Sequence, residues 1–163
     1  MYLCNRVGGQ VSDSSFCQPT LNIFEYFRGK TQAAGLFEDR FGRIQRSFVV
    51  SVDGTVDEGN LTLDEHFIFD DGKKEHRIWR IQNRAGSYIG FADDIPSQAR
   101  GKAEGNRFSW RYQMALRAGG IPIKFAFDDK MVLFSGGVMV SRARITKWGL
   151  HVGTVTIVFT KED

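Results

Sequence analysis

The strongest constraint on the fold is a series of turn motifs that divide the chain between about residue 36 and residue 159. Strand-like stretches of roughly ten residues are separated by Asp-Arg-Phe-Gly, Asp-Glu-Gly-Asn, Asp-Asp-Gly-Lys, Arg-Ala-Gly, Glu-Gly-Asn, Ala-Gly-Gly and Ser-Gly-Gly. Evenly spaced short strands with Gly, Asn and Asp turns are typical of an antiparallel meander that closes on itself. This spacing predicts an architecture and names no reaction.

Within these stretches apolar and polar residues alternate, as in strands that turn one face to a core. Most even positions are apolar at 44–53 and all of them at 108–116, most odd positions are apolar at 61–70 and 121–133, and a last strand covers 155–159. No helix-length periodic segment separates the strands, which disfavours a parallel sheet. We therefore predict an all-β fold, a closed or nearly closed antiparallel meander barrel of about nine or ten strands.

The N-terminal part of the chain has a different composition. Residues 1–18 are polar, rich in Ser and Gly and without periodicity, and we expect them to be poorly ordered. Between Pro19 and Gly29, Leu21 and Phe24 share one helical face with either Phe27 or Tyr26, which predicts a short helix that plugs or flanks the barrel. The expected organisation is a segment at 1–18 followed by a single β-barrel domain at 19–163.

Length, charge and cysteine content exclude several classes of protein. The chain has 163 residues and a net charge of +3, with Lys and Arg scattered among acidic residues. A nucleic-acid-binding protein usually carries a clustered basic stripe, so no nucleic-acid partner is expected. No apolar run reaches the length of a membrane helix, and the first residues are too short for a signal peptide, so the chain as given is expected to be soluble. Cys4 and Cys17 lack metal-site spacing.

A few charged residues fall on the apolar face of their strands. Glu65 shares a face with Leu and Phe at 61–69, Asp129 with Phe and Met at 125–131, and Arg77 with the Trp and Ile that follow it. A buried carboxylate costs several kcal/mol unless it is paired or neutralised, and Arg77, Arg142 or Arg144 could supply the partner. These groups either form a polar spot inside the barrel, or lie at strand ends in water.

Other polar residues receive a structural interpretation. Asp39 and Asp93 adjoin turns and are expected to be hydrated, while a bulge near Lys130 would reverse the parity of Asp129. The Asp doublets suit turns, and His66 and His76 lack the spacing of a metal site, although the sequence leaves their approach in space open. No nucleophile elbow or phosphate-binding loop is present, so no metal, cofactor or catalytic residue is predicted.

Aromatic residues on the inward faces indicate a ligand cavity or, alternatively, a filled core. We favour a cavity, since nine or ten strands make a wide barrel. The predicted ligand-binding residues are Glu65, Arg77, Trp79, Trp110, Tyr112, Phe125, Phe127, Asp129 and Arg142.

Five stretches together resemble a bacterial family defined as a domain of unknown function, whose members are often described as lipoproteins. They are LNIFEYFRGKTQAAGLFEDRFG at 21–42, LTLDEHFIFDDG at 61–72, WRYQM at 110–114, FAFDDKM at 125–131 and SRARITKWGLHVGTVTIVF at 141–159. The resemblance implies a lipocalin-like barrel and peripheral association with the cell envelope or periplasm. It draws attention to Phe41-Gly42, Glu65, Trp79, Tyr112, Asp128-Asp129, Arg142 and Lys147.

The chain departs from the family pattern at two places. It shows no signal peptide and no lipobox, so lipidation of Cys4 is not expected. Lys130 also stands where the resemblance leads us to expect an aromatic residue after the Asp pair.

These observations favour a protein that binds a small apolar or amphipathic, lipid-like molecule inside the barrel, with Glu65, Arg77 and Asp129 fixing its polar group. One alternative is an enzyme of the same fold that uses Glu65 or Asp129 as a general acid or base. Another is a non-catalytic interaction module of the cell envelope, with a filled core and an exposed apolar patch. The sequence does not identify the ligand or the oligomeric state.

Overall fold

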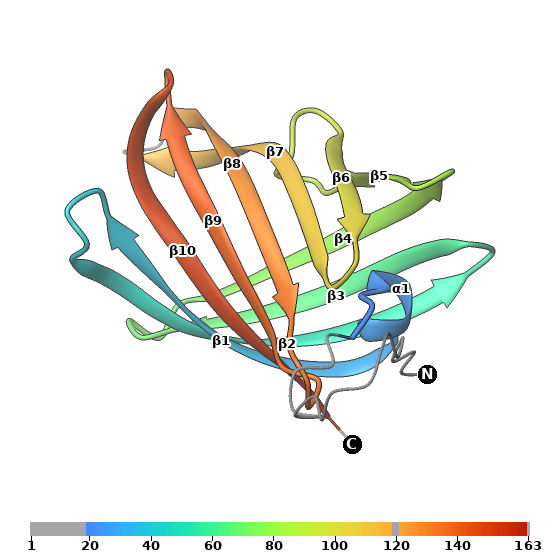
Figure 1. Ribbon diagram of the computed structural model, residues 1–163. Helices are drawn as coiled ribbons and strands as arrows, with labels where there is room; N and C mark the ends of the chain where they lie inside the picture. The colour runs from blue at the N-terminus through green and yellow to red at the C-terminus, as the bar shows by residue number, and fades with distance from the viewer. Residues whose placement is uncertain (1–18, 119–120, 163) are drawn as a thin grey trace, which may run out of the picture.

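The computed structural model describes residues 19–118 and 121–162, which form a closed all-β barrel of ten antiparallel strands (Figure 1). Each strand pairs with the next along the chain, and β1 closes the barrel against β10. The predicted meander barrel is thereby confirmed. The strands are β1 (Gly29–Asp39), β2 (Ile44–Asp57), β3 (Asn60–Phe69), β4 (Lys74–Arg84), β5 (Ser87–Phe91), β6 (Ala99–Glu104), β7 (Arg107–Ala118), β8 (Ile121–Leu133), β9 (Met139–Lys147) and β10 (Leu150–Lys161).

The register of the strands decides which side chains enter the barrel. Successive side chains of a strand point to opposite faces, so one shifted residue would reverse the whole face. The pairing of β7 with β8 runs without a shift from Arg107 opposite Val132 to Ala118 opposite Ile121. The bulge considered near Lys130 is absent from this pairing. The odd positions of β8, Asp129 among them, therefore keep their inward direction, and Asp129 is buried.

A single short helix among the described residues, α1 (Ile23–Tyr26), closes one end of the barrel (Figure 1). Ile23 is buried, the backbone N–H of Leu21 donates to the carbonyl of Gly105 at 2.8 Å, and the Tyr26 hydroxyl donates to the carbonyl of Gly137 at 2.9 Å. These bonds attach α1 to two of the turns at this end. The predicted N-terminal helix is present, and it plugs the barrel.

The shortest strands of the barrel are β5 and β6, which have only 5 and 6 residues. Part of β4 and part of β7 therefore have no strand between them. The segment 92–98 covers this place, because the backbone N–H of Ala115 in β7 donates to the carbonyl of Asp94 at 3.1 Å. On β6, a Cβ at Gly101 would overlap the indole of Trp110, so the missing side chain lets this ring lie against the wall.

The expectation that segment 1–18 is poorly ordered, and the expectations for Cys4 and Cys17, concern residues outside the described ranges. Within those ranges no helix has the length and apolar character needed to cross a membrane.

Candidate functional site

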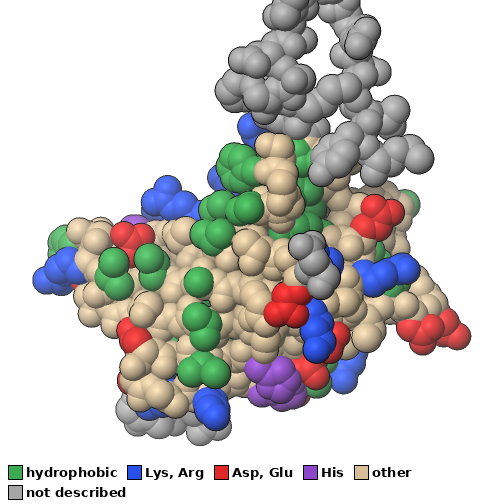
Figure 2. All heavy atoms as spheres, turned by 90° about the horizontal axis from the view of Figure 1, so that it is seen from below, with side chains coloured by type: hydrophobic (Ala, Val, Ile, Leu, Met, Phe, Trp, Pro, Cys, Tyr) green, Lys and Arg blue, Asp and Glu red, His purple; other side chains and the backbone are tan. Residues whose placement is uncertain are grey.

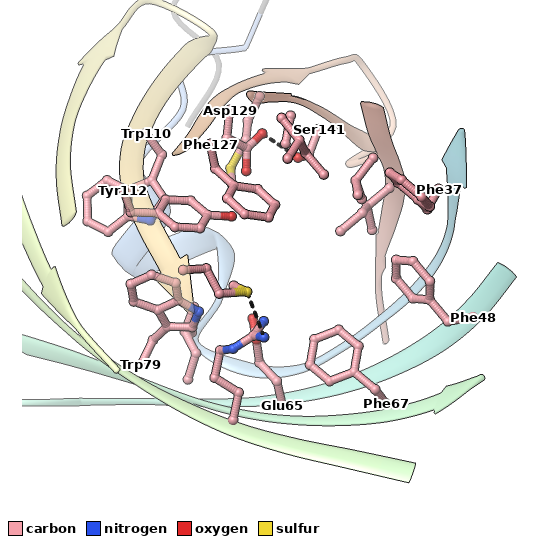
Figure 3. A pocket seen from close by; sticks show the side chains of 18 of the residues that line it. Phe37, Phe48, Glu65, Phe67, Trp79, Trp110, Tyr112, Phe127, Asp129 and Ser141 are labelled. Carbon is pink, nitrogen blue, oxygen red and sulfur yellow. Dashed lines mark hydrogen bonds and ion pairs between the residues drawn. The ribbon is translucent and has the colours of Figure 1, made fainter. Parts of the chain in front are cut away.

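The interior of the barrel contains a cavity of about 450 Å³ (Figure 3). Ile23 and Phe27 line it at the end closed by α1. At the opposite end the lining includes Arg46 and Glu75, whose side chains are 30% and 53% exposed, so the cavity reaches solvent there. The interior is therefore open, as predicted, and the barrel has one closed end and one mouth.

Stacked and edge-on aromatic rings form one side of the cavity. Trp79 of β4 lies edge-on to Trp110 and Tyr112 of β7, with ring centroids 5.8 and 5.4 Å apart. Tyr112 stacks on Phe127 of β8 at 5.0 Å and an interplanar angle of 8°. Such contacts hold the rings in place and present flat apolar surfaces to the interior. In Figure 3 these four labelled side chains lie together around one side of the cavity.

A group of three charged residues, the inner polar cluster of Glu65, Arg77 and Asp94, lies against this aromatic side. The Arg77 guanidinium donates through Nε and Nη2 to Oδ2 of Asp94, at 2.9 and 2.7 Å. Arg77 Nη1 lies 3.9 Å from Oε2 of Glu65, directly across the β3–β4 pairing. The side chains of Glu65 and Arg77 are only 14% and 18% exposed. One cation thus serves two carboxylates in a largely apolar space.

Asp94 reaches Arg77 because segment 92–98 crosses the open place in the wall. Its second oxygen, Oδ1, is buried and has no hydrogen-bond partner among the described residues. A buried acceptor without a partner is costly. Strand alternation could not single out Asp94, because a loop residue has no inward or outward parity.

A second acidic group enters the cavity from β8. Oδ1 of Asp129 accepts a hydrogen bond of 2.6 Å from Oγ of Ser141 on β9, and both residues are buried (Figure 3). Burial raises the pKa of Asp129 to about 6, the Ser141 hydrogen bond acting in the opposite direction. Ser141 carried no sequence signal of its own, since it is a small polar residue at an ordinary inward position.

Burial also decides the ionisation of the inner polar cluster. It raises the pKa of Glu65 to about 7, although the nearby Arg77 opposes the change, and Asp94 and Asp129 reinforce it. The Arg77 pKa is raised, because the attraction of Glu65 and Asp94 outweighs its own desolvation. Burial likewise raises the pKa of the Tyr112 hydroxyl. Around neutral pH the cavity therefore contains carboxyl groups that can be either protonated or charged.

Exposed apolar side chains lie at the strand ends around the mouth. Phe41, in the β1–β2 turn, is 67% exposed, and Trp148, between β9 and β10, is 88% exposed. Leu150, two residues after Trp148, is exposed as well. The Arg40 guanidinium lies 4.6 Å from the centroid of the Phe41 ring, and Lys147 Nζ lies 4.3 Å from that of Trp148. A molecule that approaches the mouth meets apolar surface bordered by cations.

The structure brings together eight of the nine predicted ligand-binding residues. The eight that line the cavity are Glu65, Arg77, Trp79, Trp110, Tyr112, Phe125, Phe127 and Asp129. Arg142 is the correction: it is exposed on the outside of β9, because the inward positions of that strand are the odd ones, such as Ser141 and Ala143. Arg77, not Arg142, is the arginine that contacts Glu65.

The two turn-proximal aspartates lie outside the cavity. Asp39 accepts hydrogen bonds within its turn from the backbone N–H groups of Phe41 and Arg43, and Asp93 is exposed. Cavity residues that sequence analysis did not single out include Phe37, Phe48, Phe67 and Met114, all at regular inward positions of their strands.

The family model "Protein of unknown function (DUF3833)" matches residues 2–161. The chain belongs to this family. The resemblance stated from the sequence is therefore confirmed, whereas a lipoprotein character is not shown. No curated protein matches the chain by sequence.

Solved structures with a similar fold are distant in sequence. An S-type phycobiliprotein lyase from Guillardia theta superposes with a TM-score of 0.61 at 10% identity, over 86% of this chain and 90% of that chain. A protein of unknown function from the DUF3598 family of Nostoc punctiforme gives a TM-score of 0.60 at 11% identity, over 89% of this chain. This chain spans 51% of that longer protein. At such identities the likeness shows the fold alone.

Proposed function

We propose that the barrel binds one small, largely apolar molecule whose polar group lies at the inner polar cluster. The observation that carries the proposal is the cavity of about 450 Å³ with aromatic walls and few charged groups. Ligand pockets typically measure about 300–1,000 Å³ and combine apolar walls with a few convergent polar groups. The apolar surface at the mouth offers such a molecule an entry. The likeness to a phycobiliprotein lyase supports the barrel fold alone.

The charges around the cavity favour a particular polar group. Two carboxyl groups, those of Glu65 and Asp94, share the Arg77 guanidinium, and Asp129 accepts its hydrogen bond from Ser141 rather than from an arginine. The inner polar cluster therefore has two carboxyl groups for one cation, and Asp129 adds a third carboxyl group to the cavity wall. An amine, or another hydrogen-bond donor, would satisfy these acceptors, whereas a fatty-acid carboxylate would add a like charge. We propose an amphipathic ligand with a donor or cationic end.

The raised pKa of Glu65 supports a second candidate, an enzyme that uses this carboxyl as a general acid or base. A pKa of about 7 suits proton transfer near neutral pH. This candidate requires a bound molecule that is converted. Mass spectrometry of a ligand recovered after incubation with the protein distinguishes the two, since an enzyme would return an altered molecule.

Native mass spectrometry of the purified protein, followed by organic extraction, tests the proposed function. We expect a co-purifying species, or a one-to-one complex with added dodecylamine that is stronger than the complex with dodecanoate. Dodecylamine binding should weaken in Glu65→Gln and persist in Asp64→Asn, a matched change on the outer face of the same strand. Equal binding by all three proteins would contradict the proposed cluster. No complex with either probe, and no co-purifying species, would contradict ligand binding itself.

A further inference from the structure

The β3–β4 hairpin carries a second group of polar side chains, on its outer face. The antiparallel register places His66 of β3 directly opposite His76 of β4, and Asp64 lies two residues before His66 on the same face. The two imidazole rings stack with centroids 4.5 Å apart and an interplanar angle of 16°. We call Asp64, His66 and His76 the outer cluster. It is separate from the cavity, because alternate residues of a strand point to opposite faces.

The three side chains of the outer cluster converge on one point. Nε2 of His66 lies 2.9 Å from Oδ1 of Asp64, and Nε2 of His76 lies 2.7 Å from the same oxygen. One oxygen and two ring nitrogens thus form a compact triangle of potential ligand atoms, all within 4.8 Å of one another. Ligands bound to one ion at about 2.0–2.2 Å lie roughly 3–3.5 Å apart. Only small side-chain movements are needed to admit an ion.

We propose that Asp64, His66 and His76 form a surface site for a divalent transition-metal ion of the Zn²⁺ or Cu²⁺ type. Two imidazoles and one carboxylate suit such ions, whereas Mg²⁺ and Ca²⁺ require more oxygen ligands. The side chains are 41–60% exposed, so ions reach the site from solvent. Exposure also leaves the remaining coordination positions open to water or to a further ligand.

A further carboxylate lies near the outer cluster, and an exposed lysine, Lys74, lies two residues before His76. Asp53 of β2 is exposed and pairs with Asp64 in the register, which adds a second carboxylate to this part of the outer face. Arg77, the cation nearest in sequence to His76, points instead into the barrel. Figure 2 shows histidine side chains at the surface, with acidic and basic side chains near them. The inference is independent of the proposed function, since no residue of the outer cluster lines the cavity.

Isothermal titration calorimetry with ZnCl₂ tests the site in the full chain without a histidine tag, after both cysteines have been alkylated. We expect one ion per chain. His66→Ala and His76→Ala should each weaken binding by more than about 100-fold, because losing a direct ligand costs at least as much as losing a supporting residue. His151→Ala is the matched control, and it should bind zinc like the wild type, since His151 lies away from the cluster beside Thr154.

NMR of the histidine rings supplies a second readout that does not depend on binding heats. Zinc should shift the ring signals of His66 and His76 and leave those of His151 unchanged. Equal zinc affinity in His66→Ala and the wild type would overturn the proposal, as would a wild-type chain that takes up no zinc at millimolar concentration. Both variants replace exposed side chains, and circular dichroism confirms that each retains the barrel.

Discussion

The two faces of the β3–β4 hairpin carry similar charged groups in opposite environments. On the inner face Glu65 is paired with Arg77, and both are largely withdrawn from water. One residue away, Asp64 contacts His66 and His76 on the outer face, where the two histidines are exposed and Asp64 is half-buried. A charged side chain that is withdrawn from water costs free energy unless it is paired, whereas a charged side chain in contact with water costs little. The inner face is therefore suited to a ligand that satisfies fixed charges, and the outer face to an ion that arrives from solution.

The largest expected effect on the free energy of unfolding follows from replacing Arg77, the cation of the inner polar cluster. Arg77→Met keeps most of the apolar volume but leaves Glu65 without its counter-charge and Asp94 without its donor. We expect a loss of about 3 kcal/mol in the free energy of unfolding at pH 8, the low end for a broken buried pair because Asp94 is partly hydrated. Arg80→Met, on the outer face of β4, should change it by less than about 0.5 kcal/mol. Urea denaturation measures both, and similar losses would erase the contrast between the faces.

The pH dependence of stability should identify Glu65. Folding raises its pKa from 4.5 to about 7, so the folded state binds the proton more tightly than the unfolded state. Its contribution is therefore most favourable below pH 4.5 and is lost as pH rises through 7. The loss is on the order of 3 kcal/mol for a change of this size.

Glu65→Gln should remove that part of the pH profile, which urea denaturation of both proteins between pH 4 and pH 8 would measure. Asp129 contributes in the same direction at slightly lower pH, because its pKa is raised from 3.8 to about 6. A slope should therefore remain in Glu65→Gln and disappear with the additional change Asp129→Asn. Identical wild-type and Glu65→Gln profiles would show that Glu65 is hydrated.

A smaller effect on the free energy of unfolding is expected from removing the hydrogen bond between Ser141 of β9 and Asp129 of β8. Ser141→Ala removes the donor that lies 2.6 Å from Asp129 and should cost about 1–2 kcal/mol at pH 8. The cost should shrink at pH 5, where Asp129 is largely protonated. Ser51→Ala, at an exposed position of β2, is the control and should be neutral. Thermal unfolding at pH 5 and pH 8 measures these costs. An equal cost of Ser141→Ala at both pH values would contradict the prediction.

The smallest effect on stability should come from the outer cluster. Asp64→Asn removes the carboxylate that contacts both histidines, yet the free energy of unfolding should change by less than about 0.5 kcal/mol. The same variant should lose zinc binding and keep dodecylamine binding. A stability loss as large as that of Arg77→Met would contradict the distinction between the two faces.

Strand alternation was sufficient to place the mid-strand charges. Glu65, Arg77 and Asp129 lie at regular inward positions, and no register shift affects them. Asp94 could not be placed in this way, because a loop residue has no parity and its contact with Arg77 depends on how segment 92–98 crosses the wall. Arg142 was placed wrongly, because the resemblance drew attention to it, whereas the alternation of β9 turns it outward.

The outer cluster shows what a search for fixed spacings overlooks. His66 and His76 have no metal-site spacing along the chain, but they are equally distant from Asp71 in the turn that joins β3 and β4. In a tight hairpin such positions face each other across the strands. The equal distance of the two histidines from the turn therefore predicts that they face each other. The stacking of their rings could be seen only in the structure.

The most direct test of the central claim compares ligand binding after filling the cavity and after an equal change outside it. Val155 lines the cavity from β10, whereas Val158 of the same strand points outward. Titration with 1-aminoanthracene, followed by its fluorescence, should show one binding site in the wild type and in Val158→Trp, and a strong loss in Val155→Trp. Equal binding by all three proteins would contradict a ligand site inside the barrel.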